Sequence, residues 1–325
     1  MAVKYINPFT DFGFKKLFGE EANKDILIDF LNELLREEQG EIVDLTFKKT
    51  EQLGAAVIDR KAIFDIYCEN EKGEKFIVEM QKAKHNFFKD RSVFYSTFPI
   101  REQAEKGDWD YKLKAVYTIA ILDFIFDEDK EDKDKFLYRV KLSDIETHKV
   151  FYDKLTFIYI EMPKFNKTLE ECKTKFDKWL YVIKNLERFD SYPEELQEKI
   201  FEKFFGEAAL ANLTREELDA YDESLKIYRD LKGCIDTAYD EGVLEGIQKM
   251  KNHLDKLKEE KRMAEEREQR LEEEKRMAEE RERRLEEEKR LAEERERKLE
   301  EEKQKMRDLL KSMGLSEDEI SEKLK

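Results

Sequence analysis

The stretch AIFDIYCENEKGEKFIVEMQ, residues 62–81, decides the fold because it predicts a β-hairpin. Two apolar, β-branched runs flank a polar segment that contains Gly73, the pattern of two antiparallel strands joined by a short loop. The residue numbers of facing pairs in such a hairpin have a constant sum. If the loop is 70–74, Glu69 faces Lys75, and the same register places Asp65 opposite Glu79.

Asp65, Glu79 and Gln81 form a candidate metal site on this hairpin. Gln81 lies two residues beyond Glu79, so both side chains point to the same face of the strand. Directly opposed carboxylates repel each other, and a cation between them offsets that repulsion. Mg²⁺ binds one or two carboxylates, keeps several waters and completes its octahedron with phosphate oxygens. The hairpin therefore predicts a site for Mg²⁺, or for Mn²⁺ in its place, that suits phosphodiester hydrolysis. The alternative is a solvent-facing hairpin that happens to carry acids.

A basic segment follows the hairpin and predicts the contact with nucleic acid. Residues 82–101 carry five Lys and Arg residues against Asp90 alone, a local net charge of +4 in a chain of net charge −16. Such side chains dominate nucleic-acid affinity through phosphate contacts. The Phe residues among them have a helical spacing that favours packing on the sheet, whereas Arg91 and Tyr95 lie one turn apart and can share a phosphate-facing surface. The candidate nucleic-acid contacts are Lys82, Lys84, Lys89, Arg91 and Tyr95.

The order of these residues resembles the recombination-promoting nuclease / putative transposase family of the PD-(D/E)xK nuclease superfamily. The resemblance covers roughly the first two thirds of the chain, and the charged tail suits that family's variable C-terminal extension. It implies an α/β fold with a PD-(D/E)xK restriction-endonuclease-like core and a mixed sheet. The residues that carry it are 59–61 (Asp-Arg-Lys), Asp65, 79–81 (Glu-Met-Gln), Arg91, Tyr95, Gly107, Tyr111 and the opening segment NPFTDFGFKKLF, residues 7–18.

The resemblance also implies a role for each residue of the hairpin site. Asp65 and Glu79 would bind the metal ion, with the backbone carbonyl of Met80 as a third ligand. Gln81 stands where the wider superfamily has lysine, and a neutral amide can orient water only through hydrogen bonds. We therefore hypothesise that Lys61, four residues before Asp65 on the same strand face, supplies the missing positive charge.

The first predicted helix adds one more catalytic candidate. Residues from about 12 to 36 have the apolar periodicity of a helix. Asp11 lies at its start, and an acid on the first helix often completes sites of the superfamily that the chain resembles. The alternative is that Thr10 or Asp11 only caps the helix.

The remaining sequence predicts further strands, a helical region and a charged tail. Strands are expected near 43–47, at 115–126, near 136–140 and at 155–161, and the acid-rich segment 127–132 is expected to be a solvated loop. Thr214 and Glu217 have the spacing of a capping box. The expected divisions are a nuclease-like core at 1–165, a helical accessory region at 166–240, a charged repeat helix at 241–308 and a terminal helical element at 309–325.

The tail contains three near-identical repeats of fourteen residues between 261 and 302. Ala264 and Leu271 recur in a spacing of seven, which indicates a coiled coil. The second position of that seam, however, is occupied by Glu268, Lys275 and their equivalents, and charge pairs four residues apart stabilise an isolated helix. A weak, self-associating coiled coil and a free-standing charged helix both stay open.

Composition limits the functions that the chain can serve. The net charge of −16 argues against indiscriminate nucleic-acid binding, so DNA must meet a local basic surface. The three cysteines lack metal-ligand spacing and suit a reducing cytoplasm, and no apolar stretch is long enough to cross a bilayer. We expect a cytoplasmic, Mg²⁺-dependent DNA endonuclease that promotes recombination or transposition, with homo-oligomerisation through the helical region or the tail left open. The alternative is a catalytically silent nuclease fold that acts as a scaffold or regulator through its tail.

Overall fold

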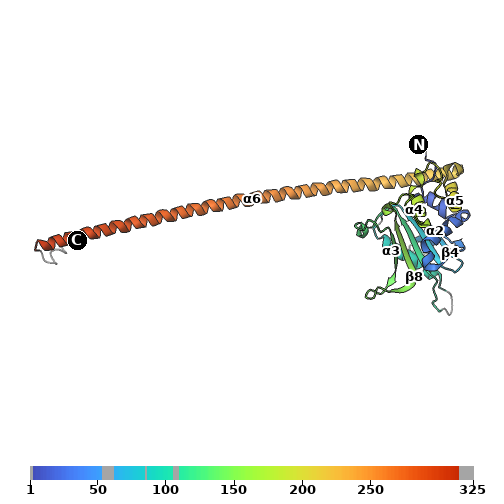
Figure 1. Ribbon diagram of the computed structural model, residues 1–325, viewed down its shortest axis with the longest axis horizontal. Helices are drawn as coiled ribbons and strands as arrows, with labels where there is room; N and C mark the ends of the chain where they lie inside the picture. Colours follow the sequence, from blue (N-terminus) through green and yellow to red (C-terminus); the bar gives the residue numbers. More distant parts are fainter. Residues whose placement is uncertain (1–2, 53–61, 85, 105–109, 315–325) are drawn as a thin grey trace. The chain divides into compact units, whose positions relative to one another are not determined.

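The computed structural model describes residues 3–52, 62–84, 86–104 and 110–314. The chain divides into two compact units, Met1–Tyr239 and Asp240–Lys325. In the described part of the first unit, a six-stranded mixed sheet has the order β1-β4-β5-β6-β8-β7. Helices lie on both faces of this sheet (Figure 1).

Three neighbouring strands of the sheet run parallel to one another, and the strands on either side of these three pair antiparallel. β5 pairs with β6 and β6 with β8 in parallel, whereas β1 and β4 extend the sheet beyond β5 and β7 lies along β8. A separate antiparallel pair joins β2 to β3. The strands are β1 (Leu45–Phe47), β2 (Glu51–Gln52), β3 (Ala62–Ile63), β4 (Ile66–Asn70), β5 (Lys75–Gln81), β6 (Val116–Leu122), β7 (Leu137–Ser143) and β8 (Val150–Glu161).

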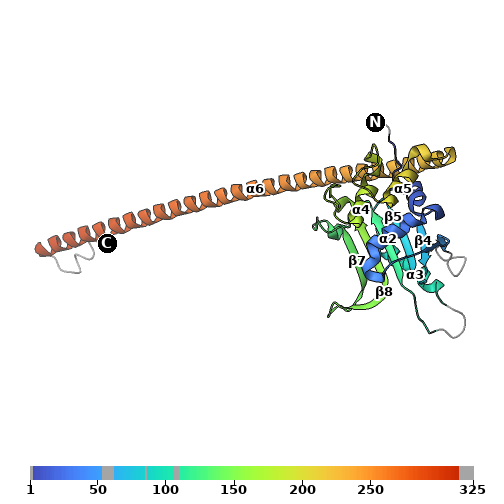
Figure 2. The same ribbon diagram turned by 45° about the vertical axis from the view of Figure 1, so that its right-hand side comes forward.

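The two faces of the sheet carry different helices. On one face, alternate residues of the strands such as Ile66, Val78 and Ile119 pack in the main core with α1, α2, α4 and α5. On the other face, Tyr67 and Ile77 pack with Phe98 of α3. Figure 2 shows the same arrangement after a turn of the molecule. The helices are α1 (Asp11–Phe18), α2 (Lys24–Gln39), α3 (Phe88–Glu102), α4 (Lys175–Asn185), α5 (Lys199–Ala208) and α6 (Arg215–Ser312).

The predicted α/β class, mixed sheet and long charged C-terminal helix are confirmed, with one correction to the helices. The helical segment expected at about 12–36 is helical but divided into two helices, α1 and α2. Gly19 ends α1 through a hydrogen bond from its backbone N–H to the carbonyl of Lys15 at 2.8 Å. The side chain of Asn23 then donates to the carbonyl of Lys16 at 2.8 Å, so the chain turns before α2 begins.

α6 is one continuous helix of 98 residues that begins at the predicted capping box. The Thr214 N–H donates to Glu217 Oε2 at 2.7 Å and the Glu217 N–H donates to Thr214 Oγ1 at 3.2 Å, which satisfies both ends of that box. In the second unit its surface carries ion pairs three or four residues apart, such as Arg284 with Glu280 at 2.9 Å. Of the terminal helical element expected at 309–325, residues 309–312 continue α6, and residues 315–325 lie outside the described residues. None of the helices described here has the length and apolar content needed to cross a membrane.

Candidate active site

The hairpin brings Asp65 and Glu79 together, as its register predicts. Glu69 pairs with Lys75 and Ile66 pairs with Val78. One step further, the Asp65 N–H donates to Glu79 Oε1 at 3.3 Å, and the Met80 N–H donates to Asp65 Oδ2 at 2.8 Å. The carboxylate of Glu79 is therefore held by the backbone of Asp65, in the bend between β3 and β4, and that of Asp65 by the backbone of β5.

Both carboxylates sit in an environment that disfavours their charge. Glu79 is only 7% exposed, and its burial, followed by the nearby charge of Asp65, raises the pKa of Glu79 to about 8. Burial also raises the pKa of Asp65, with the charge of Asp11 acting in the same direction. The positive charges of Arg91 and Lys15 oppose the shift at Glu79. Two neighbouring acids with raised pKa values ionise together most readily when a cation lies between them.

Gln81 is bound at both ends of its amide. Arg91 of α3 donates a hydrogen bond to Gln81 Oε1, and Gln81 Nε2 donates to the carbonyl of Ala83 at 3.1 Å. The guanidinium of Arg91 also lies 5.6 Å from the centre of the Tyr95 ring, so the two residues expected to share a surface do contact each other. Tyr95 packs edge-on against Phe64, with ring centroids 5.3 Å apart.

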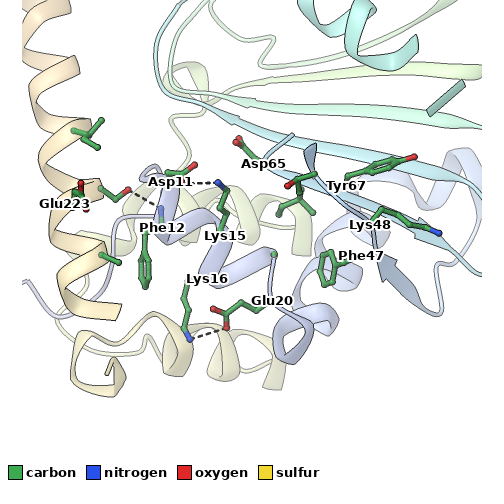
Figure 3. A pocket seen from close by; sticks show the side chains of 16 residues that line it. Asp11, Phe12, Lys15, Lys16, Glu20, Phe47, Lys48, Asp65, Tyr67 and Glu223 are labelled. Carbon is green, nitrogen blue, oxygen red and sulfur yellow. Dashed lines mark hydrogen bonds and ion pairs between the residues drawn. The ribbon is translucent and has the colours of Figure 1, made fainter. Parts of the chain in front are cut away.

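Thr10, rather than Asp11, caps the first helix. Its side-chain oxygen accepts a hydrogen bond from the Gly13 N–H at 3.0 Å. The carboxylate of Asp11 is left to pair with Lys15 at 3.0 Å. Figure 3 shows this pair beside Asp65. Asp11 is therefore close enough for its charge to raise the pKa of Asp65.

Gly13 explains why the opening motif contains a glycine at this point. A Cβ atom added there would lie 2.1 Å from the backbone oxygen of Asn7. The Asn7 N–H in turn donates to the hydroxyl of Tyr221 at 3.0 Å, and the Phe12 N–H donates to Ser224 Oγ at 3.1 Å. The motif therefore holds α1 between the sheet and the first turns of α6.

A cleft of about 690 Å³ opens beside Asp65, between α1, the β1 and β4 edge and α6. From α6 its lining includes Ala220, Glu223, Ser224 and Ile227. No local pattern in the sequence marks these residues, because only the packing of α6 on α1 brings them to the site. Lys48 lines the cleft too and is paired with Glu69 at 3.0 Å.

The basic residues after the hairpin fall into two kinds. Lys84 pairs with Asp127 and Lys89 pairs with Glu128, so the acid-rich loop is exposed as expected but holds two of the predicted DNA-contacting lysines. Lys82 is half-buried and, within the described ranges, makes neither an ion pair nor a hydrogen bond. Burial lowers the pKa of Lys82, and the charges of Asp11 and Asp65 oppose that shift.

Several predicted residues cannot be placed. Lys61, proposed to supply positive charge, and Asp59, Arg60 and Gly107 of the resembling motif lie outside the described residues. Their roles stay predictions.

The donor set fits a hard divalent cation. Among the residues that the structure describes, no group of three or more His, Cys, Asp and Glu side chains is placed to hold a metal ion. Asp65 and Glu79 offer two opposed carboxylates, and Mg²⁺ typically takes one or two carboxylates together with waters and substrate phosphate. A closed structural zinc site, which needs four protein ligands, does not fit this arrangement.

The comparison with protein families gives one match. The family model described as PD-(D/E)XK nuclease family transposase matches residues 8–238. No curated protein and no solved structure matches the chain. The matched span includes the hairpin, the basic segment and the first turns of α6.

Proposed function

This chain belongs to the PD-(D/E)XK nuclease family of transposases, and from that membership we propose that it is a Mg²⁺-dependent DNA endonuclease of the cytoplasm that promotes recombination or transposition. The observation that carries the proposal is the pair of carboxylates at the hairpin. Glu79 Oε1 accepts a hydrogen bond from the Asp65 N–H at 3.3 Å, Asp65 Oδ2 accepts one from the Met80 N–H at 2.8 Å, and both carboxyl groups have raised pKa values. A purely structural role would not require two opposed acids, one buried and one half-buried.

In this proposal Asp65 and Glu79 hold the divalent ion, with the Met80 carbonyl as a third ligand. The bound ion would lower the pKa of a water molecule and neutralise charge on the phosphate. Gln81 would orient the attacking water with the hydrogen-bonding capacity that Arg91 and Ala83 leave unused. Asp11 would tune the local charge through its pair with Lys15.

The DNA would approach along the basic segment and α3. Arg91 and Tyr95 contact each other beside the carboxylates, so a phosphate bound by Arg91 would lie near the metal. Lys84 and Lys89 are exposed on the same segment, and they would exchange their acidic partners for phosphates. The three free cysteines, two of them buried, are compatible with a reducing compartment.

Nicking of supercoiled plasmid tests the proposal. We expect cleavage by the full chain with Mg²⁺, no cleavage with EDTA, and a loss of at least about 100-fold in both Asp65→Asn and Glu79→Gln. Lys178→Gln is the control, since it removes one charge of an ion pair with Glu198 that lies outside this cleft. Folded wild-type protein that cuts no DNA with Mg²⁺ or Mn²⁺ would favour the silent scaffold instead.

A further inference from the structure

The cations around the carboxylate pair differ in whether a protein group already holds them. Three of them, Lys15, Lys82 and Arg91, act electrostatically on Asp65 or Glu79. Lys15 is paired with Asp11 at 3.0 Å, and Arg91 donates a hydrogen bond to the side chain of Gln81. In the part of the chain that the structure describes, Lys82 is the one of the three without such a partner.

The position of Lys82 makes its lack of a partner informative. It follows directly on Gln81, the last residue of β5, and lines a cavity of about 120 Å³ with Asp123 and Tyr228. An ammonium that loses part of its hydration without gaining a partner costs free energy. A protein retains such a group most readily where a negatively charged ligand completes its contacts.

We propose that Lys82 is a catalytic residue that contacts the scissile phosphate and supplies the positive charge that the neutral Gln81 cannot. This inference rests on the proposed nuclease function. Lys82, the residue after the Glu-Met-Gln triplet, then has the role that was hypothesised for Lys61, which lies outside the described residues.

The role is that of a fixed charge. During hydrolysis a bond forms between the water oxygen and phosphorus, and the bond between phosphorus and one sugar oxygen breaks. The water gives up a proton to solvent, and the departing sugar oxygen takes one from solvent. Lys82 stays protonated throughout and stabilises the negative charge that builds up on the non-bridging phosphate oxygens, as a donor aimed at a developing oxyanion does.

The test is single-turnover cleavage of supercoiled plasmid at saturating DNA and Mg²⁺, with Lys82→Gln, Lys82→Met and Lys82→Arg. We expect the rate to fall about 100-fold or more in the Gln and Met variants and to recover in large part in the Arg variant. Mn²⁺ binding, measured by titration calorimetry without DNA, stays within about twofold of wild type. Lys178→Gln, which removes a partly buried lysine that is paired with Glu198 at 2.9 Å outside the cleft, keeps the wild-type rate.

Thermal unfolding separates a catalytic from a structural role. Removal of an unpaired, half-buried charge raises the unfolding temperature of Lys82→Met, whereas loss of a structural contact lowers it. The assignment is overturned if Lys82→Gln cleaves at the wild-type rate, or if the rate and the unfolding temperature of Lys82→Met fall together. It is also overturned if only Lys61→Gln loses cleavage. Wild-type protein that does not cleave overturns the nuclease proposal itself, an outcome distinct from cleavage that does not depend on Lys82.

Discussion

The Asp65 N–H donates to Glu79 Oε1, and the Met80 N–H returns a bond to Asp65 Oδ2. These two hydrogen bonds fix the two carboxylates at the end of a hairpin whose strands are mostly buried. The backbone thus orients both acids before any ligand binds. Side chains placed in this way lose little conformational entropy when a metal ion joins them.

Metal affinity should depend steeply on pH. The pKa of Glu79 is raised to about 8 in the metal-free protein, so below that pH a proton must leave before the ion binds. We expect the apparent Mg²⁺ affinity to fall by at least about tenfold per pH unit below about pH 8, and to level off above it. Titration calorimetry between about pH 6 and about pH 9 measures this slope. An affinity that is flat over this range would show that Glu79 is not a ligand.

Neutralising the acid-rich loop should strengthen DNA binding. Asp127 and Glu128 hold Lys84 and Lys89 in exposed ion pairs, which DNA must break. Exposed ion pairs of this kind contribute little free energy, so we expect Asp127→Asn with Glu128→Gln to raise the affinity for DNA by about three- to tenfold. The measurement is fluorescence anisotropy with a duplex in Ca²⁺ to prevent cleavage. Glu131→Gln with Asp132→Asn, which removes two exposed acids of the same loop, controls for net charge, and an equal gain in that variant would refute a specific competition.

Gly13→Ala should destabilise the protein by several kcal/mol. The added methyl would meet the Asn7 carbonyl at 2.1 Å, which forces α1 away from its place in the core. Urea unfolding of the full chain measures the loss. Gly233→Ala is the control, because no atom lies within 4 Å of a Cβ there, and alanine in a helix gains about 1 kcal/mol over glycine. Equal effects of the two variants would contradict the packing described for α1.

The repeat segment of α6 should behave as a single helix. In a parallel, in-register pair Glu268 would face Glu268 and Lys275 would face Lys275, and like charges at that position oppose pairing. We expect Leu285→Gln to leave both the helicity and the sedimentation mass of the full chain unchanged. A drop in mass in this variant would instead establish a coiled coil.

The hairpin was predictable because it is local. Its apolar runs, its Gly-containing loop and the constant sum of facing residue numbers fix the register, and these are contained in twenty residues of sequence. That Asp65 lies opposite Glu79 then follows from the geometry of the hairpin alone. Thr10 as the helix cap was one of two local alternatives, and the hydrogen bond to Gly13 decided between them.

The remainder of the site was not predictable, because it depends on contacts between distant segments. Ser224 reaches Phe12 across 212 positions of sequence, and no periodicity reports such a pairing. The ion pairs of Lys84 and Lys89 likewise arise from the packing of the loop after β6 against α3. The break between α1 and α2 was missed because both helices bury apolar residues in the same core, so that their combined pattern resembles one helix.

The most direct test is the position of a bound ion. Crystals soaked in Mn²⁺ give anomalous diffraction that locates the metal without regard to the surrounding density. The account predicts an anomalous peak between the carboxylates of Asp65 and Glu79, and its loss in Asp65→Asn. A peak at a different group of residues, in a protein that cleaves DNA with Mn²⁺, would contradict the assignment of this hairpin as the catalytic centre.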